Sequence, residues 1–139
     1  MSTYTLYCDG AARGNPGHAS AGAVLKNEKG EIIDKVSEYL GKTTNNQAEY
    51  QALILGLQKA IKHQVQKLEV YLDSELVVKQ MNRLYKVKHP AMLSLFEEAV
   101  ILSRKFSSFK ISHIGREKNS EADLLANLAI DQHLSKPHA

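Results

Sequence analysis

Cysteine and tryptophan are the scarcest residue types in this sequence of 139 residues, which contains one cysteine, Cys8, and no tryptophan. A single cysteine excludes an internal disulfide, and no group of cysteines and histidines has the spacing of a zinc site. The sequence also lacks an apolar run long enough to cross a bilayer, and its start, MSTYTLYCDG, lacks the features of a secretory signal. We therefore expect a cytoplasmic protein that does not bind membranes, with Cys8 as a small core residue in a strand.

A large excess of charge of one sign is missing too. Lysine and arginine number 18 against 15 aspartates and glutamates, which gives a formal net charge of +3. This small positive charge is compatible with a partner that carries phosphate but does not establish one. With 43% hydrophobic residues, the chain can bury the core of a single domain. We expect this domain to span residues 1–132 and to leave a frayed tail at residues 133–139.

One segment contains basic residues and no acidic ones. It runs from Leu76 to Lys88 and includes Lys79, Arg83 and Lys86. Two interpretations fit this pattern: a solvated helix face with its following loop, or a patch that contacts the phosphates of a nucleic acid.

Hydrophobic patterning predicts three strands at the start of the chain, followed by alternating helices and strands. Alternating β-branched and aromatic residues are typical of strands, and apolar residues three or four positions apart are typical of helices. This order indicates an α/β fold with a mixed sheet, antiparallel at one edge and parallel at the other, covered by helices. The predicted strands are residues 3–8, 20–26, 31–40, 67–72 and 109–114, and the predicted helices are residues 46–63, a helix capped by Ser74, a helix opened by Pro90 and a helix after Asn119.

Local signals refine these elements. Residues 10–17, GAARGNPG, are expected to form a loop after the first strand, and residues 27–30 a tight turn. Thr44 and Gln47 fit a capping box at the start of the first helix, and Ser120 and Asp123 fit one at the start of the last helix. The inner face of the helix opened by Pro90 is expected to consist of Leu93, Phe96, Val100 and Ile101.

Two aspartates stand where predicted strands end. Asp9 follows the first strand, and Asp73 follows the strand at residues 67–72. If these strands are parallel neighbours, the two carboxylates lie side by side at the edge where ligands bind in such sheets. Aspartate is also common where a strand gives way to a turn, so each residue alone has a structural explanation.

Two further acids stand near the starts of helices. Glu49 precedes Leu53 and Leu57 by four and eight residues, which places it on the apolar face of its helix, where an unpartnered carboxylate is costly. Its alternative role is to interact with the positive end of the helix dipole. Asp123 has a similar position in the last helix, and capping alone is a sufficient role for it.

A cleft containing all four carboxylates would be unstable without cations, because the charges repel one another and lose hydration. Oxygen-only ligands suit Mg²⁺, or Mn²⁺ in its place. Two such ions, roughly 3.5–4 Å apart, activate a water molecule and stabilise the leaving oxygen of a phosphodiester. The acids Asp9, Glu49, Asp73 and Asp123 therefore predict metal-dependent phosphodiester hydrolysis without a covalent nucleophile.

Four motifs in order carry a resemblance to type 1 ribonuclease H over nearly the whole chain. They are YCDGAARGNPG around Asp9, TTNNQAEYQAL around Glu49, YLDSELV around Asp73 and REKNSEADLLANLA around Asp123. The resemblance implies a five-stranded mixed sheet of order 3-2-1-4-5 with strands 1–3 antiparallel. It also implies hydrolysis of the RNA strand of RNA–DNA hybrids by two bound metal ions, which leaves 5′-phosphate and 3′-hydroxyl ends. The four acids would be both metal ligands and catalytic residues.

The resemblance also assigns substrate contacts. Asn45 and backbone groups near Gly10 and Ala11 would read 2′-hydroxyls, which distinguish RNA from DNA. Thr44 would help to hold a phosphate of the DNA strand, with plain helix capping as the alternative for Thr44 and its neighbouring asparagines. The implied contact residues are Gly10, Ala11, Asn15, Thr44, Asn45 and Asn46.

The chain departs from some relatives at two places. Many relatives have a histidine in a flexible loop before the last acid. Here the candidates for this position are Arg116 and His113. We favour Arg116, because a guanidinium can reach a phosphate without titrating. Only residues 82–89 separate two predicted helices, too few for the basic handle that some members use to grip the hybrid. Lys79, Arg83, Lys86 and Lys88 are expected to replace it in part.

Two other functions fit the same residues less well. A different nuclease of the same fold would cut another substrate, and a non-catalytic hybrid-binding module would keep the fold alone. The run Asn45-Asn46-Gln47 and the spacing of the acids favour ribonuclease H over a different nuclease of this fold. The presence of all four acids disfavours a non-catalytic hybrid-binding module. We expect a monomer that needs no protein partner.

Overall fold

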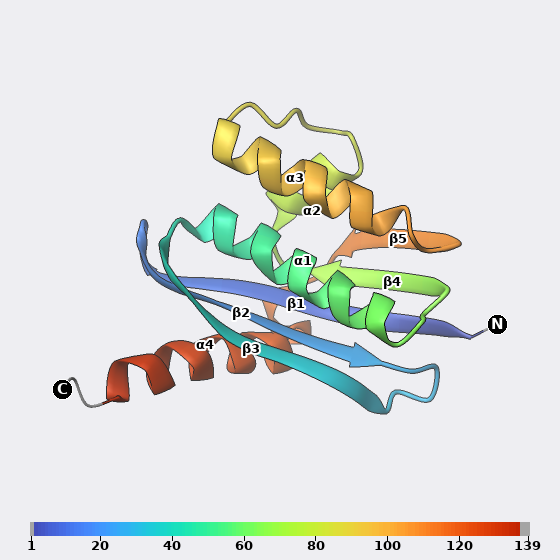
Figure 1. Ribbon diagram of the computed structural model, residues 1–139, viewed down its shortest axis with the longest axis horizontal. Helices are drawn as coiled ribbons and strands as arrows, with labels where there is room; N and C mark the ends of the chain where they lie inside the picture. The colour runs from blue at the N-terminus through green and yellow to red at the C-terminus, as the bar shows by residue number, and fades with distance from the viewer. Residues whose placement is uncertain (1, 137–139) are drawn as a thin grey trace.

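A five-stranded mixed sheet forms the centre of the computed structural model, which describes residues 2–136 (Figure 1). Its order is β3-β2-β1-β4-β5. Neighbours among the first three strands are antiparallel, whereas β4 is parallel to β1 and β5 is parallel to β4. The predicted α/β fold and its strand order are confirmed. The strands are β1 (Thr3–Gly14), β2 (Gly17–Lys26), β3 (Ile32–Thr43), β4 (Lys67–Leu72) and β5 (Ser108–His113).

Helices cover both faces of the sheet. One face carries α1, with α3 packed on α1, and the other carries α4, which contacts β1, β2 and β3 (Figure 1). Within residues 2–136, no helix is long and apolar enough to cross a membrane. The helices are α1 (Asn45–Lys62), α2 (Glu75–Met81), α3 (Pro90–Ser103) and α4 (Ser120–Ser135), with a short 3-10 helix, η1 (Arg116–Lys118), before α4.

Most of the predicted helix starts are confirmed. Thr44 and Gln47 form the expected capping box of α1, and the Ser74 side chain accepts a hydrogen bond from the backbone of Val77 at the start of α2. The predicted box of Ser120 and Asp123 is wrong. Because η1 ends one residue before Asn119 and α4 begins one residue after it, Asn119 is the N-cap. Its carbonyl accepts the first helical hydrogen bond, from the backbone N–H of Asp123.

The first hairpin is longer than predicted. Residues 10–14 continue β1, and β2 begins at Gly17, so the expected loop reduces to the turn Asn15–Pro16. Small residues in this segment have low intrinsic strand propensity, but pairing between β1 and β2 along the whole hairpin overrides it. Consequently Asp9 lies within β1 rather than at its end.

The inner face of α3 also differs from the prediction. Met92 and Ala99 are its buried residues, whereas Leu93 is 39% exposed and Ile101 is 59% exposed. Phe96 and Val100, as predicted, pack against the core in part, and the Phe96 ring meets the ring of Tyr50 edge to face. Because α3 packs on α1 rather than on the sheet, contact with that helix selects its buried face.

Two glycines let the helices approach the sheet closely near Asp9. A Cβ on Gly10 would lie 2.3 Å from the backbone of Ala48 and Glu49 in α1, and a Cβ on Gly22 would lie 2.1 Å from the carbonyl oxygen of Ala122 in α4. Gly22 is the strand partner of Asp9. The two helices therefore approach the sheet closely at the level of this carboxylate.

The buried core joins α1 to the central strands. Leu6, Cys8 and Leu72 from the sheet and Leu53 and Leu57 from α1 are fully buried. Burial of each large aliphatic side chain contributes about 1.5–3 kcal/mol to stability. Cys8 is a free thiol in this core, as predicted.

The chain stays helical beyond residue 132. α4 continues to Ser135, and the ring of His133 stacks on that of Tyr39 at a centroid distance of 3.6 Å. The predicted tail, residues 133–139, therefore begins as helix, and residues 137–139 lie outside the described part of the chain.

Candidate functional site

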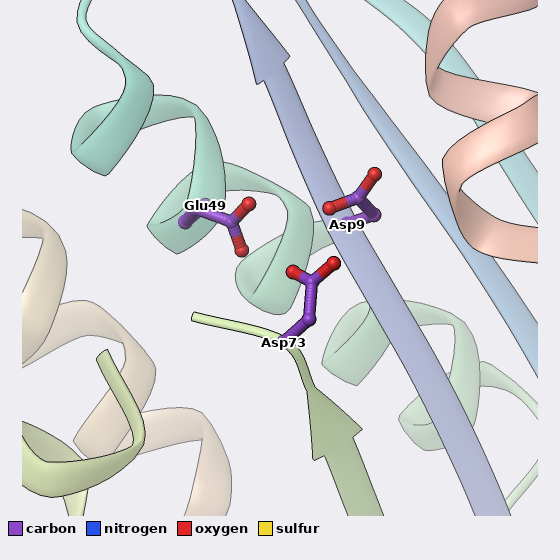
Figure 2. A group of neighbouring side chains, drawn as sticks. All are labelled: Asp9, Glu49 and Asp73. Carbon is purple, nitrogen blue, oxygen red and sulfur yellow. The ribbon is translucent and has the colours of Figure 1, made fainter. Parts of the chain in front are cut away.

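Three carboxylates meet at one edge of the sheet. Each of Asp9, Glu49 and Asp73 offers an oxygen atom, and these atoms all lie within 4.8 Å of one another. Figure 2 shows the three side chains pointing toward one another from β1, from α1 and from the segment that follows β4. The predicted convergence of these acids is present in the structure.

The strand register explains why Asp9 and Asp73 are neighbours. The parallel pairing of β1 with β4 ends at Cys8 and Leu72, and Asp9 and Asp73 are each the next residue along the chain. β4 stops there, whereas β1 continues to Gly14 beside β2 alone. This difference in strand length leaves an open edge next to Asp9.

A cleft of about 580 Å³ occupies this open edge. Its wall includes the three clustered acids and also Asp123. Of the other predicted site residues, Gly10, Ala11, Asn45, Asn46, His113 and Arg116 line the same cleft. The structure therefore brings most of the predicted site together around one opening.

Glu49 is held at the cleft by β1. Its side chain is only 6% exposed, and its Oε1 atom accepts a hydrogen bond of 3.1 Å from the backbone N–H of Gly10. The second oxygen, Oε2, is buried and has no hydrogen-bond partner among residues 2–136. A buried carboxylate oxygen without a partner is costly, and a cation is the kind of ligand that would satisfy it.

Burial and mutual repulsion make two of these acids hard to ionise. Burial raises the pKa of Asp9, and the charges of Glu49 and Asp73 raise it further. Burial also raises the pKa of Glu49, as does the charge of Asp73, while the Gly10 hydrogen bond and the Arg116 charge act in the opposite direction. Divalent cations would relieve this repulsion, so the donor set fits a hard divalent metal.

Asp123 lies beside the cluster rather than within it. It does not belong to the group that meets within 4.8 Å, but it lines the cleft and contacts the carboxyl group of Asp9 closely enough to raise the pKa of Asp9. Its Oδ1 atom accepts a hydrogen bond of 3.2 Å from Asn127. The fourth acid therefore approaches from α4, on the other side of Asp9 from α1.

Asn15 and Thr44 are near the cleft but do not line it. The Oδ1 atom of Asn15 accepts a hydrogen bond of 3.0 Å from the backbone N–H of Asn45, which fastens the hairpin turn to the start of α1. The Thr44 hydroxyl accepts a hydrogen bond from the backbone N–H of Gln47, as is usual for a helix N-cap. Both residues shape the start of α1, where Asn45 and Asn46 face the cleft.

The basic segment lies outside the cleft. Lys79 forms an ion pair of 2.6 Å with Glu75 and lies over the ring of Tyr85. The Arg83 guanidinium lies 5.2 Å from the ring centre of Phe96. Lys86 and Lys88 are exposed in the segment between α2 and α3.

Sequence reasoning missed several residues at the cleft. Asn127 lines it, as do Ala12, Ser74, Ile114 and Gly115. Asn119 is fully buried beside it, and its side chain donates a hydrogen bond of 2.8 Å to the carbonyl oxygen of Cys8. The spacing of Asn127 four residues after Asp123 on one helix was a usable signal, whereas Asn119 acts through a distant strand that no local pattern indicates.

Comparisons with known proteins agree with this geometry. Residues 7–129 match the family model described as "Reverse transcriptase-like". The chain is 41% identical over 127 residues to a bifunctional protein of Mycobacterium tuberculosis and 40% identical over 125 residues to ribonuclease HI of Halobacterium salinarum. It is also similar to the crystal structure of LC11 ribonuclease H1 in complex with an RNA/DNA hybrid, with 42% identity and a TM-score of 0.90.

These similarities differ in how much of each relative they cover. The alignments include 91% of this chain but 35% of the mycobacterial protein, and 90% of this chain but 63% of the Halobacterium enzyme. The chain therefore spans about a third and about two thirds of the length of these two relatives. The match to LC11 ribonuclease H1 covers 95% of this chain and 99% of that one.

Proposed function

This chain belongs to the type 1 ribonuclease H family, and we propose that it hydrolyses the RNA strand of RNA–DNA hybrids, leaving 5′-phosphate and 3′-hydroxyl ends. The observation that carries the proposal is the meeting of Asp9, Glu49 and Asp73 within 4.8 Å at the cleft. The substrate follows from the LC11 relative, whose structure contains an RNA/DNA hybrid.

The proposed cofactor is Mg²⁺, with Mn²⁺ as a substitute, in two ions per site when substrate is bound. Asp9, Glu49 and Asp73 would hold them, with Asp123 as the fourth ligand, because these residues offer only oxygen atoms and Glu49 Oε2 is unpartnered. Held by these residues, the ions would supply an activated water and would stabilise the leaving oxygen of the phosphodiester. Glu49 is buried and accepts the Gly10 hydrogen bond, so its carboxylate is held in place, which limits its reorganisation during the reaction.

Arg116 is our choice for the auxiliary residue at the scissile phosphate. It lines the cleft, and its positive charge acts on Glu49. A guanidinium stays charged at all relevant pH values and can donate two parallel hydrogen bonds to a phosphate. His113 lines the same cleft and is the alternative.

The hybrid is proposed to bind along the start of α1 and the β1 hairpin. Asn45, Asn46, Gly10 and Ala11 line the cleft beside the acids. Asn45 and backbone groups near Gly10 and Ala11 would read the 2′-hydroxyls of the RNA strand, and Asn46 would contact the hybrid beside them. Asn15 fixes the backbone of Asn45, and Thr44 would add a contact to a phosphate of the DNA strand.

The basic segment is proposed to contact the nucleic acid outside the cleft. Lys86 and Lys88 are exposed, and Lys79 and Arg83 belong to the same part of the chain. Long-range attraction of phosphates needs only exposed positive charge, so these residues would add affinity without sequence preference.

A cleavage panel tests the proposed function. The purified protein is incubated with Mg²⁺ or Mn²⁺ and four labelled substrates: an RNA–DNA hybrid, duplex DNA, duplex RNA and an RNA–DNA junction. We expect metal-dependent cleavage of the RNA strand of the hybrid, with no cleavage of duplex DNA. Equal cleavage of duplex DNA would indicate another nuclease of the same fold, and binding without cleavage would indicate a non-catalytic hybrid-binding module.

The remaining expectations stay predictions. We propose that residues 1–132 form one domain, that the protein acts as a monomer without an obligatory protein partner, and that it works in the cytoplasm. Sedimentation of the purified protein with and without hybrid would test whether it is a monomer.

A further inference from the structure

A chain of hydrogen bonds on α4 leads to the carboxylate of Asp123. The Nδ2 atom of Asn127 donates a hydrogen bond of 3.2 Å to Asp123 Oδ1 and one of 3.0 Å to the backbone carbonyl of Asp123. The Oδ1 atom of Asn127 accepts a hydrogen bond of 3.3 Å from Arg13 Nη2. Arg13 also forms an ion pair of 2.7 Å with Asp131.

The fold places these residues in a row. Asp123, Asn127 and Asp131 follow one another at intervals of four on α4 and therefore share a face of the helix. On β1, Asp9 and Arg13 are four residues apart and therefore lie on the same face of the strand. That face is directed toward α4, because Leu6 and Cys8 at the alternate positions contact Gly56 of α1.

The hydrogen bond from Arg13 fixes the orientation of the Asn127 amide. A guanidinium can only donate, so Arg13 must meet the oxygen of the amide, which leaves the NH₂ group to face Asp123. A donor at this position holds the Asp123 carboxylate near Asp9 although the two acids repel each other. Without it, the Asp123 side chain is free to turn toward solvent, because Asp123 is only half-buried.

We propose that Asn127 is a positioning residue that orients Asp123 toward the divalent-cation site, with Arg13 holding the amide in place. The proposal rests on the proposed function of the cleft and adds a role for a residue that is not itself one of the four acids. Outer partners of metal-ligating carboxylates typically change metal affinity or activity by about 10–100-fold when they are removed.

The test uses Asn127→Ala and Asn127→Leu. Alanine is the best helix former and leucine a good one, so both variants are expected to fold, and leucine keeps the bulk of the side chain without its donor. Gln132→Ala is the matched control, since it removes an exposed amide from the same helix. Circular dichroism checks that all variants keep the helix content of the wild type.

Two measurements separate positioning from general damage. In cleavage assays, both Asn127 variants should need about tenfold more Mg²⁺ for half-maximal rate and should have a lower kcat, while KM for the hybrid changes by less than about twofold. In calorimetric titrations without substrate, Mn²⁺ should bind both variants about tenfold more weakly than the wild type. Gln132→Ala should match the wild type in both measurements.

The outcomes distinguish the inference from the proposed function. If the wild type cleaves the hybrid and the Asn127 variants match Gln132→Ala in Mg²⁺ dependence and Mn²⁺ affinity, the positioning role is rejected while the proposed function stands. If the wild type does not cleave the hybrid, the proposed function fails, and the Mn²⁺ titration alone decides whether Asn127 orients Asp123. A change confined to KM would assign Asn127 to substrate binding and overturn the proposal.

Discussion

The backbone N–H of Gly10 donates a hydrogen bond of 3.1 Å to Glu49 Oε1, and this bond ties the strand that carries Asp9 to the helix that carries Glu49. The contact is possible because Gly10 has no Cβ to separate β1 from α1. It uses one oxygen of Glu49 and leaves Oε2 without a partner. One glycine therefore both closes the packing of α1 on the sheet and sets the position of a candidate metal ligand.

Gly10→Ala is expected to damage both stability and catalysis. The new Cβ would lie 2.3 Å from the backbone of Ala48 and Glu49, so α1 must move away from β1. Overpacking of this kind costs roughly 1–3 kcal/mol, and the displaced Glu49 should lower kcat. Urea unfolding and cleavage assays measure the two effects. Gly30→Ala is the control: its positive φ costs about 1–2 kcal/mol, but nothing lies within 4 Å of the new Cβ, so turnover should stay at the wild-type rate.

Asp9→Asn is expected to remove most activity while leaving hybrid binding in place. The substitution keeps the shape of the side chain but removes a charge from the centre of the acid cluster. Loss of several kcal/mol of metal-dependent stabilisation of the transition state corresponds to a rate decrease on the order of a thousandfold. Single-turnover cleavage and fluorescence anisotropy measure rate and binding separately. Full activity in Asp9→Asn, alongside an unchanged Glu28→Gln control, would reject the role of Asp9.

The same substitution is expected to stabilise the metal-free protein. The pKa of Asp9 is higher in the folded protein than the value of about 4 in an unfolded chain, because of burial and then the charges of Glu49 and Asp73. Its contribution to stability is therefore complete below about pH 4 and is lost progressively as the pH rises toward the folded pKa. Asn cannot ionise, so Asp9→Asn should avoid this loss.

Urea unfolding in EDTA at pH 5 and pH 8 checks this sign. The stability advantage of Asp9→Asn should be larger at pH 8, where we expect about 1–3 kcal/mol, than at pH 5. Added Mg²⁺ should reduce or reverse the advantage, because it binds the folded wild type better than the variant. An advantage that shrinks as the pH rises would contradict the electrostatic account of the cluster.

Arg116→Ala is expected to slow turnover more than His113→Ala does. Both residues line the cleft, but Arg116 is the one whose charge acts on Glu49, and a guanidinium can donate two parallel hydrogen bonds to a phosphate. Comparison of kcat for the two variants at saturating Mg²⁺ decides between them. If only His113→Ala is slow, the histidine is the auxiliary residue.

The position of the acids was predictable because it depends on where the parallel pairing of strands ends and where helices start. Asp9 and Asp73 are each the first residue after the parallel pairing of their strands, and Glu49 lies on the apolar face of α1. Hydrophobic periodicity determines such positions from short stretches of sequence. The capping box of Thr44 and Gln47 was predictable for the same reason, since all its contacts are local.

Features that depend on long-range contact were not predictable in this way. Residues 10–14 lack the residue types typical of strands, and they extend β1 only because β2 pairs with them. The buried face of α3 is chosen by its contact with α1, so Leu93 is exposed although its spacing suggested burial. Asn127 and Arg13 meet across more than a hundred residues of chain, and no local pattern links them.

We expect Asp9, Glu49 and Asp73 together to hold a divalent cation at the cleft. Anomalous diffraction from crystals of the wild-type protein grown with Mn²⁺ tests it most directly, because the signal locates the ion itself. We expect a peak within coordination distance of oxygens from all three carboxylates, with Asn127 still hydrogen-bonded to Asp123. Bound Mn²⁺ only elsewhere on the protein, or no peak at the cleft at saturating Mn²⁺, would contradict it.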